Sequence, residues 1–145
     1  MESTATEVEV EQAVIALFFE GSETAWLVLD LVSPQDMQEP LHQRACEAVR
    51  RVLDLGKDPV PLTVAAAMAS DKALNDMGGA EYFLGIIRRF GRNRDIAREL
   101  CSALIDTAQK RALAFEIAQT EARLADPKLT ARQFARTHRD PTYRS

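Results

Sequence analysis

Cysteine and histidine are scarce in this sequence, and their scarcity argues against several kinds of site. Cys46 and Cys101 lie within apolar helical patterns, and neither has a second cysteine or a paired histidine at metal-ligand spacing. We therefore expect two reduced thiols in the core of a cytoplasmic protein, with no disulfide, no metal and no other cofactor.

Long apolar runs and a basic N-terminal stretch are also lacking. No segment is apolar over the roughly 18 consecutive residues that a membrane span requires. The segment from Met1 to Glu11 is acidic, where a secretion signal would carry positive charge. We therefore expect neither a membrane span nor a signal peptide.

Aromatic residues make up only 6% of the chain, whereas alanine, leucine, arginine, glutamate and glutamine are plentiful. This composition favours helices over strands. With 145 residues, of which 46% are apolar, the chain can bury one core. The formal charge of −4 is uneven, because residues 1–60 hold twelve acidic and four basic side chains and residues 61–145 hold ten and fourteen. We predict an all-α protein with an acidic front and a basic back.

Hydrophobic periodicity separates a loose, disordered N-terminus, residues 1–6, from a compact helical head, residues 7–93. Apolar residues recur at steps of three and four from Val10 to Phe18, which predicts a helix buried on one face. Further helices are predicted over residues 23–31, between Pro40 and Gly56, over residues 63–69, near residues 74–77, and from Tyr82 to near Gly91. We expect Trp26, in the helix over residues 23–31, to face the core.

The longest periodic segment runs from about residue 94 to about residue 124 and predicts a protruding helix roughly 45 Å long. Its apolar residues form a narrow seam of Ile96, Leu100, Leu104, Ala108, Phe115, Ala118 and Ala122. Asp126 and Pro127 end this helix, and residues 130–137 predict a shortened second helix with Phe134 inward. Residues 94–138 therefore form a hairpin-like extension, and residues 139–145 form a tail.

Five stretches occur in a distinctive order. They are Glu9 to Ile15, Val32 to Met37 with His42 after it, Gly56 to Val64, Gly78 to Leu84, and the long helix that starts at Ile96 and carries Arg111. Over residues 7–120 they resemble the N-terminal collar domain of bacterial replicative helicases of the DnaB family. Unrelated helical bundles would not reproduce the same breaks at the same intervals.

The resemblance implies a helical globule joined to a helical hairpin, which pairs with the hairpin of a neighbouring subunit. It also implies a ring of such domains beside the motor ring, where primase and, in some systems, loading proteins bind. The sequence departs from the family at Met37, where an aromatic residue is usual, and at Ala16, where glycine is common. Compared with the family, we expect the second hairpin helix to be shortened, and these 145 residues include no motor domain.

The sequence also lacks a phosphate-binding loop. Such a loop needs a glycine five residues before Gly-Lys and a serine or threonine after it. Gly56 and Lys57 are preceded at that spacing by Arg51 and followed by Asp58. No serine or cysteine lies in a nucleophile motif. We therefore expect a protein that is not an enzyme and has no catalytic residues.

His42 has two interpretations. With Glu39 and Cys46 on the same helix face it could bind a metal, but a structural hydrogen bond is the simpler interpretation. The acidic residues near the first helix also have two interpretations. Glu7, Glu9, Glu11 and Glu20 could include a catalytic pair, but we expect them to complement exposed backbone N–H groups near a helix start.

The densest basic cluster precedes and enters the long helix and consists of Arg88, Arg89, Arg92, Arg94 and Arg98. With Phe90 between them, these arginines could bind the phosphates of a nucleic acid. Alternatively, they form a solvated turn and pair with Asp95 and Glu99. We expect the second interpretation, because the protein is acidic overall and has few aromatic side chains for base stacking.

The seam of the long helix is the most informative surface, because the second helix is too short to cover it. We predict a partner-binding surface of Ile96, Leu100, Leu104, Ala108, Arg111, Phe115 and Ala118. The leading hypothesis is a non-enzymatic interaction domain in DNA replication that self-associates through this helix as a dimer or larger oligomer. It could also contact a replicative helicase, primase or helicase loader. It is either a stand-alone modulator of the helicase or the collar of a helicase separated from its motor. The alternative is a small nucleic-acid-binding regulatory protein that uses the basic cluster.

Overall fold

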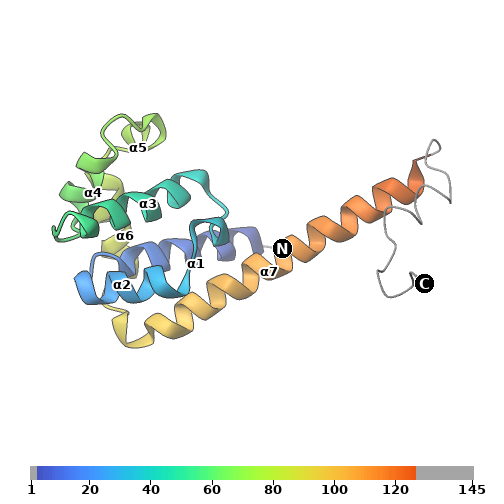
Figure 1. The fold of residues 1–145 in the computed structure, drawn as a ribbon, viewed down its shortest axis with the longest axis horizontal. Helices are drawn as coiled ribbons and strands as arrows, with labels where there is room; N and C mark the ends of the chain where they lie inside the picture. The colour runs from blue at the N-terminus through green and yellow to red at the C-terminus, as the bar shows by residue number, and fades with distance from the viewer. Residues whose placement is uncertain (1–2, 127–145) are drawn as a thin grey trace, which may run out of the picture. The chain divides into compact units, whose positions relative to one another are not determined.

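The computed structural model describes residues 3–126, with side chains from Glu7 onward. Over these residues it contains helices and no strands (Figure 1), which confirms the predicted all-α class. The helices are α1 (Ser3–Leu17), α2 (Ser22–Leu31), η1 (Pro34–Asp36), α3 (Pro40–Asp54), α4 (Pro61–Ala67), α5 (Lys72–Asp76), α6 (Ala80–Phe90), η2 (Arg94–Ile96) and α7 (Ala97–Ala125). None of these helices is apolar enough over a sufficient length to cross a membrane.

The chain divides into two units, one that ends at Ala108 and one that starts at Gln109. The predicted head ended at residue 93, whereas the first three turns of α7 belong to the first unit, which we call the head. The physical reason is that Ala97, Cys101 and Leu104 are buried there. The predicted second helix, residues 130–137, and the predicted tail, residues 139–145, lie outside the described residues.

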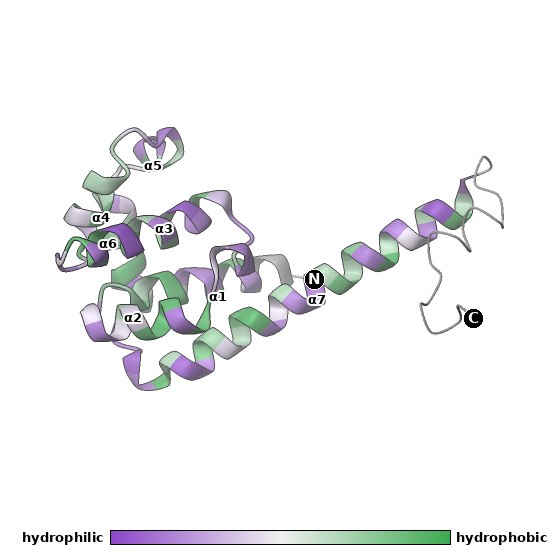
Figure 2. Cartoon of the chain, in the orientation of Figure 1, coloured by the Kyte–Doolittle hydropathy of each residue, from purple (hydrophilic) through white to green (hydrophobic). Residues whose placement is uncertain are grey.

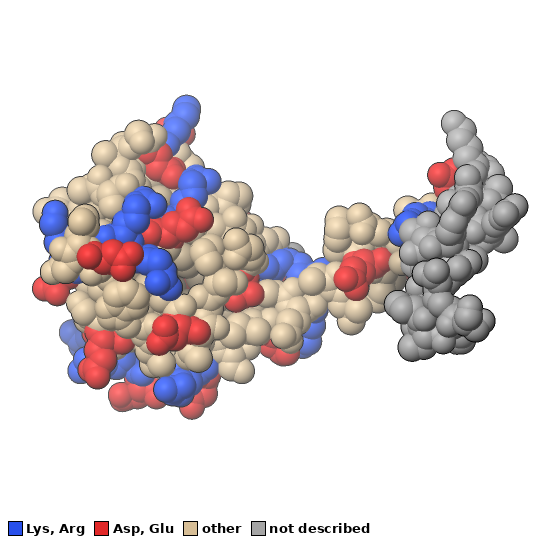
Figure 3. Space-filling view, viewed as in Figure 1, with Lys and Arg blue, Asp and Glu red and all other residues tan. Residues whose placement is uncertain are grey.

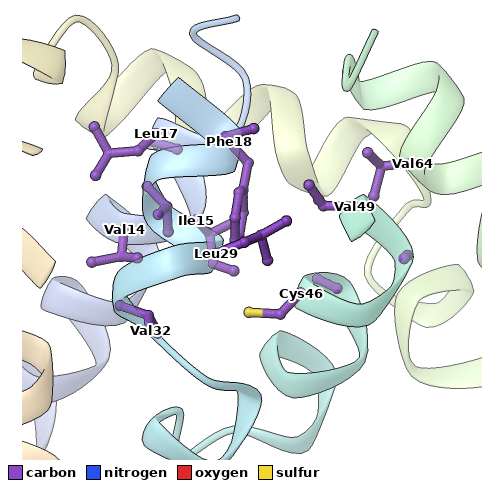
Figure 4. Close-up of a cluster of buried hydrophobic side chains, with 14 of the residues drawn as sticks. Val14, Ile15, Leu17, Phe18, Leu29, Val32, Cys46, Val49 and Val64 are labelled. Atoms are coloured by element: carbon purple, nitrogen blue, oxygen red, sulfur yellow. The ribbon is translucent and has the colours of Figure 1, made fainter. Parts of the chain in front are cut away.

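Helix α1 forms the centre of the head. It starts at Ser3, so residues 3–6 are helical and not loose as predicted. From Ala13 to Phe18 every side chain is buried, because α1 contacts α2, α3 and α6. The helix is therefore buried on all sides here, and the prediction of one buried face was too narrow. Figure 4 shows Phe18 and Ile15 packed among Leu29 and other apolar side chains of the surrounding helices.

Helix α2 buries Ala25, Val28 and Leu29 against this core. The prediction that Trp26 faces the core is wrong, because 37% of its surface is exposed. The guanidinium carbon of Arg50 in α3 lies 5.6 Å from the centre of the Trp26 ring. The indole is thus partly covered by a cation from the neighbouring helix, an arrangement that the spacing of apolar residues does not predict.

Ion pairs and caps fix the shorter helices against α3. The Asp71 carboxylate accepts a hydrogen bond from the backbone N–H of Leu74 and caps α5. The same carboxylate accepts two hydrogen bonds from the Arg44 guanidinium in α3. The hydrogen bond from Arg44 holds the pKa of Asp71 below its usual range. Between α5 and α6, Gly78 and Gly79 both adopt positive φ, which explains why glycine occupies this break.

Candidate interaction surfaces

The structure divides the predicted seam between the two units. In the head, Leu104 is fully buried by its own chain, so its assignment to a partner-binding surface is wrong. Leu100 and Ala108 are half-buried, and Ile96 in η2 is 44% exposed. In the second unit, Phe115 and Ala118 are exposed and Arg111 is half-buried. Apart from Leu104, the predicted residues are therefore at least partly exposed.

In the head, the first two buried positions of α7 each lie one residue after the predicted Ile96 and Leu100, whereas Leu104 belongs to both sets. The buried positions are Ala97, Cys101 and Leu104, and the small side chains at 97 and 101 allow the helix backbone to come close to the core. Cys101 and Cys46 are both free thiols in buried positions, as predicted. Burial raises the pKa of Cys46 to about 12 and that of Cys101 to about 11. Both thiols are therefore protonated and poorly reactive at neutral pH.

The second unit carries the largest exposed apolar side chains of α7. Leu113 is 57% exposed, Phe115 64%, Ile117 51% and Leu124 65%. At 100° per residue, Leu113, Ile117 and Leu124 lie within about 40° of one another around the helix. Phe115 lies on roughly the opposite side. Residues 109–125 thus present two apolar faces, and Figure 2 shows hydrophobic residues recurring between hydrophilic ones along this part of α7.

The prediction missed the face formed by Leu113, Ile117 and Leu124. The signal was present in the sequence, because these residues follow at steps of four and seven. It was hidden because the alanines on the other side of the helix have the same spacing. The missed face has the larger side chains and so offers more apolar area to a partner.

A buried polar network joins α1, α3 and α6. Glu11 and His42 are almost completely inaccessible, and His42 Nδ1 lies 2.8 Å from Glu11 Oε1. Since a carboxylate only accepts, His42 Nδ1–H donates to Glu11. In the neutral imidazole, His42 Nε2 accepts from the Tyr82 hydroxyl, 2.7 Å away. These contacts occupy both ring nitrogens of His42. His42 is therefore structural, which is the simpler of its two predicted interpretations.

Glu11 also holds the start of α3. Its carboxylate oxygens accept hydrogen bonds from the backbone N–H of Gln38, at 2.5 Å, and of Glu39, at 3.3 Å. These two residues directly precede α3, so the carboxylate complements backbone N–H groups at the start of another helix. The sequence predicted such contacts at the start of the first helix, where Glu11 itself lies. Glu11 stabilises α3 from a distance of 27 residues along the chain.

Two other acidic side chains, Glu9 and Glu20, bind α6 and the connection that follows it. Arg89 donates to Glu9 at 2.6 Å, and the backbone N–H of Asn93 donates to Glu20 at 2.9 Å. Glu20 therefore holds the connection between α6 and η2. Glu9, Glu11 and Glu20 thus each have a different partner: Arg89, the His42 network and the backbone of Asn93. Neither contact is the predicted one with N–H groups at the start of the first helix, because Glu20 binds the backbone at Asn93 and Glu9 forms an ion pair.

The basic cluster is divided by the structure. Arg89 is paired with Glu9, and its guanidinium carbon lies 4.9 Å from the centre of the Phe90 ring. Arg88, Arg92 and Arg94 instead line one hollow of about 810 Å³. The remaining lining is Ala16, Phe19, Glu20, Ile87, Gly91 and Asp95. Figure 3 shows basic and acidic side chains interspersed over the head in this view, so the charged surface is mixed.

The head coincides with the part of the chain that matches a known family. Residues 3–99 match the family model described as the DnaB-like helicase N terminal domain. The chain belongs to this family. The match begins with α1 and ends in the first turn of α7, so it includes the Glu11 network and the hollow but not residues 109–125.

Curated relatives and a solved structure agree with this DnaB-like assignment. The chain is 31% identical over 75 residues to the replicative DNA helicase DnaB of Geobacillus stearothermophilus, covering 52% of the chain. It is 24% identical over 80 residues to that of Rickettsia conorii, covering 55% of the chain. In both cases the matched segment spans 16% of the relative's own length.

The crystal structure of the N-terminal domain of DnaB helicase from Mycobacterium tuberculosis has the same fold. It superposes with a TM-score of 0.73 at 23% identity, and the match covers 90% of this chain and 94% of that one. The structural match thus extends beyond the DnaB-like family model and into α7. It confirms the predicted helical fold.

Proposed function

We propose that this chain is a non-catalytic protein–protein interaction domain in DNA replication, and that α7 supplies the interaction surface. The observation that carries the proposal is the exposure of four large apolar side chains between Leu113 and Leu124. The family is the non-catalytic part of a replicative helicase, which supports the absence of catalysis by this chain itself.

An isolated helical segment of this length would be only marginally stable in water. Residues 109–125 expose apolar side chains on two faces, and burial of each large side chain contributes about 1 kcal/mol or more. Docking of these faces on other helices therefore stabilises the segment and the complex together. Two faces on one helix are suited to a bundle, in which each face contacts a different neighbour.

The partner we favour is a second copy of the chain, with the α7 helices as the contact. The relatives are named as replicative DNA helicases, so a replicative helicase, a primase or a helicase loader is the further class of partner. Where the chain acts alone, this surface would allow it to join or disturb a helicase ring. We propose that role of modulator for this chain acting alone.

The test combines sedimentation equilibrium with a pulldown. We expect the protein to associate in a concentration-dependent manner, and the variant Leu113→Glu/Ile117→Glu to be monomeric with unchanged helicity of the head. Glu116→Gln/Glu121→Gln is the matched control, because it changes two exposed acidic residues in the same segment and leaves the apolar faces intact. Association that survives the glutamate substitutions would show that α7 is not the contact.

The pulldown uses the full-length replicative helicase and the primase from the source organism as separate baits. We expect one of them to retain the protein and to lose it after Leu113→Glu/Ile117→Glu. If neither bait retains it, the role in replication is wrong, whereas self-association is judged by sedimentation alone.

A further inference from the structure

We propose that the hollow lined by Arg88, Arg92 and Arg94 binds a phosphate-bearing nucleotide unit, either free or within a single strand of nucleic acid. The site lies in the head, between the end of α1, the end of α6 and η2. It is distinct from the apolar faces of residues 109–125 and does not depend on self-association.

The first observation is that these arginines have no acidic partner among the described residues. The sequence suggested pairing with Asp95 and Glu99, but none of the three guanidinium groups forms an ion pair or a hydrogen bond with another side chain of residues 7–126. Their neighbour Arg89 is paired with Glu9. The guanidinium groups that border the hollow are therefore available to an external anion, and arginine binds phosphate oxygens in a bidentate manner.

The second observation is the backbone at Arg92. Its φ of 67° lies in the left-handed region, which is unfavourable for a residue with a side chain. Glycine precedes it, but Gly91 is needed where it stands, because a Cβ there would lie 2.6 Å from the carbonyl oxygen of Ile87. A glycine at position 92 would relieve the strain. Strain of this kind is typical of binding sites, and it places an arginine at the rim of the hollow.

The third observation is the apolar part of the lining. Phe19 and Ile87 border the same hollow, and Phe19 is fixed by Phe83, whose ring centre lies 5.2 Å away. An aromatic or apolar wall beside cationic side chains is the arrangement that binds single strands, because the base packs on the wall and the phosphate contacts the cations.

Two carboxylates in the lining of the hollow weaken its attraction for phosphate groups and limit the number of phosphates that it contacts. Glu20 is engaged by the backbone N–H of Asn93, whereas the Asp95 carboxylate pairs with none of the three arginines. Three cations against two carboxylates give a weak net attraction. We therefore expect low affinity and a strong dependence on salt, with a log–log slope of about −2 for three phosphate contacts to a single strand.

The test measures fluorescence anisotropy of a labelled oligothymidylate of about 20 nucleotides, titrated with the full chain at low and moderate salt. The variant Arg88→Ala/Arg92→Gly/Arg94→Ala is compared with Arg50→Ala/Lys57→Ala/Lys72→Ala, which removes the same charge from exposed positions outside the hollow. We expect at least a tenfold loss of affinity in the first variant and less than a threefold loss in the second. Equal losses, or no binding of the oligonucleotide at low salt, overturn the proposal.

Two further arms identify the source of the phosphate and the role of Arg92. Competition by thymidine monophosphate supports the free nucleotide, competition only by unlabelled oligonucleotide supports the strand, and displacement by polyglutamate alone overturns the proposal in favour of an acidic protein segment. Arg92→Gly alone is expected to weaken binding and to leave the thermal midpoint unchanged or higher. A lower midpoint with unchanged binding would show that Arg92 serves the fold, and would overturn its place in the site.

Discussion

Glu11 provides a quantitative test of how the head is held together. The substitution Glu11→Ala removes a carboxylate with 0% exposure that accepts hydrogen bonds from Gln38, Glu39 and His42. It leaves three buried or partly buried donors without an acceptor, and breaking such a buried arrangement costs about 3–5 kcal/mol. The total stability of a domain is about 5–15 kcal/mol, so this loss is a large fraction of it.

Urea unfolding followed by circular dichroism measures the effect. With a denaturant dependence of about 2 kcal/mol per molar urea, the midpoint should fall by about 2 M. Glu9→Ala is the control, because Glu9 lies on the same helix but forms an exposed ion pair with Arg89, and we expect it to cost less than about 1 kcal/mol. If the two substitutions lower the midpoint equally, the Glu11 network does not hold α1 to α3 as described.

Three other predictions concern groups in the head. Tyr82→Phe should cost about 1–2 kcal/mol in urea unfolding, because the neighbouring imidazole nitrogen loses its buried donor; an unchanged midpoint would contradict the contact. The lowered pKa of Asp71 adds stability above the ordinary carboxyl pKa of about 4, and this contribution is lost as pH falls through the native pKa. Asp71→Asn should therefore lower the thermal midpoint at pH 7 and have a progressively smaller effect as pH falls below about 4, and an effect that does not change with pH would contradict the ion pair with Arg44. With pKa values of about 12 and 11, Cys46 and Cys101 should react with a disulfide reagent at about pH 8 only after unfolding, and rapid reaction of the native protein would show that they are accessible.

The order of the helices could be predicted because glycine and proline mark their ends. Pro40 and Pro61 are the first residues of α3 and α4, and the break at Gly78 and Gly79 precedes α6. These signals are local, so they can be read without knowledge of the neighbours. The start of α1 was missed because residues 3–6 carry no apolar repeat, and the helical periodicity becomes visible only from Val10.

The packing of α7 could be predicted only in part. In an alanine-rich helix, more than one set of apolar residues recurs at intervals of three and four. The predicted seam was one such set, and it included Ile96 and Leu100. The head selects Ala97 and Cys101 for burial, because small side chains permit close approach of the helix. That choice depends on the shape of the core, which is not visible in the sequence of α7 itself.

The polar contacts of the head could be predicted least. Glu11 and His42 are separated by 31 residues, and His42 and Tyr82 by 40. Nothing in the local sequence indicates that these side chains meet. The same applies to the basic cluster, where adjacent Arg88 and Arg89 differ: one lines the hollow and the other pairs with Glu9. The local sequence does not distinguish these two environments, because they depend on the tertiary structure.

Hydrogen exchange at residues 109–125 tests most directly whether α7 is stabilised by docking on another chain. Amides of a lone helix exchange rapidly, because its hydrogen bonds open on their own. We expect peptides from this segment to be protected at micromolar protein and to lose protection on dilution to nanomolar, while peptides from α1 and α3 stay protected throughout. Protection of residues 109–125 that is the same at every concentration would contradict pairing between copies through α7.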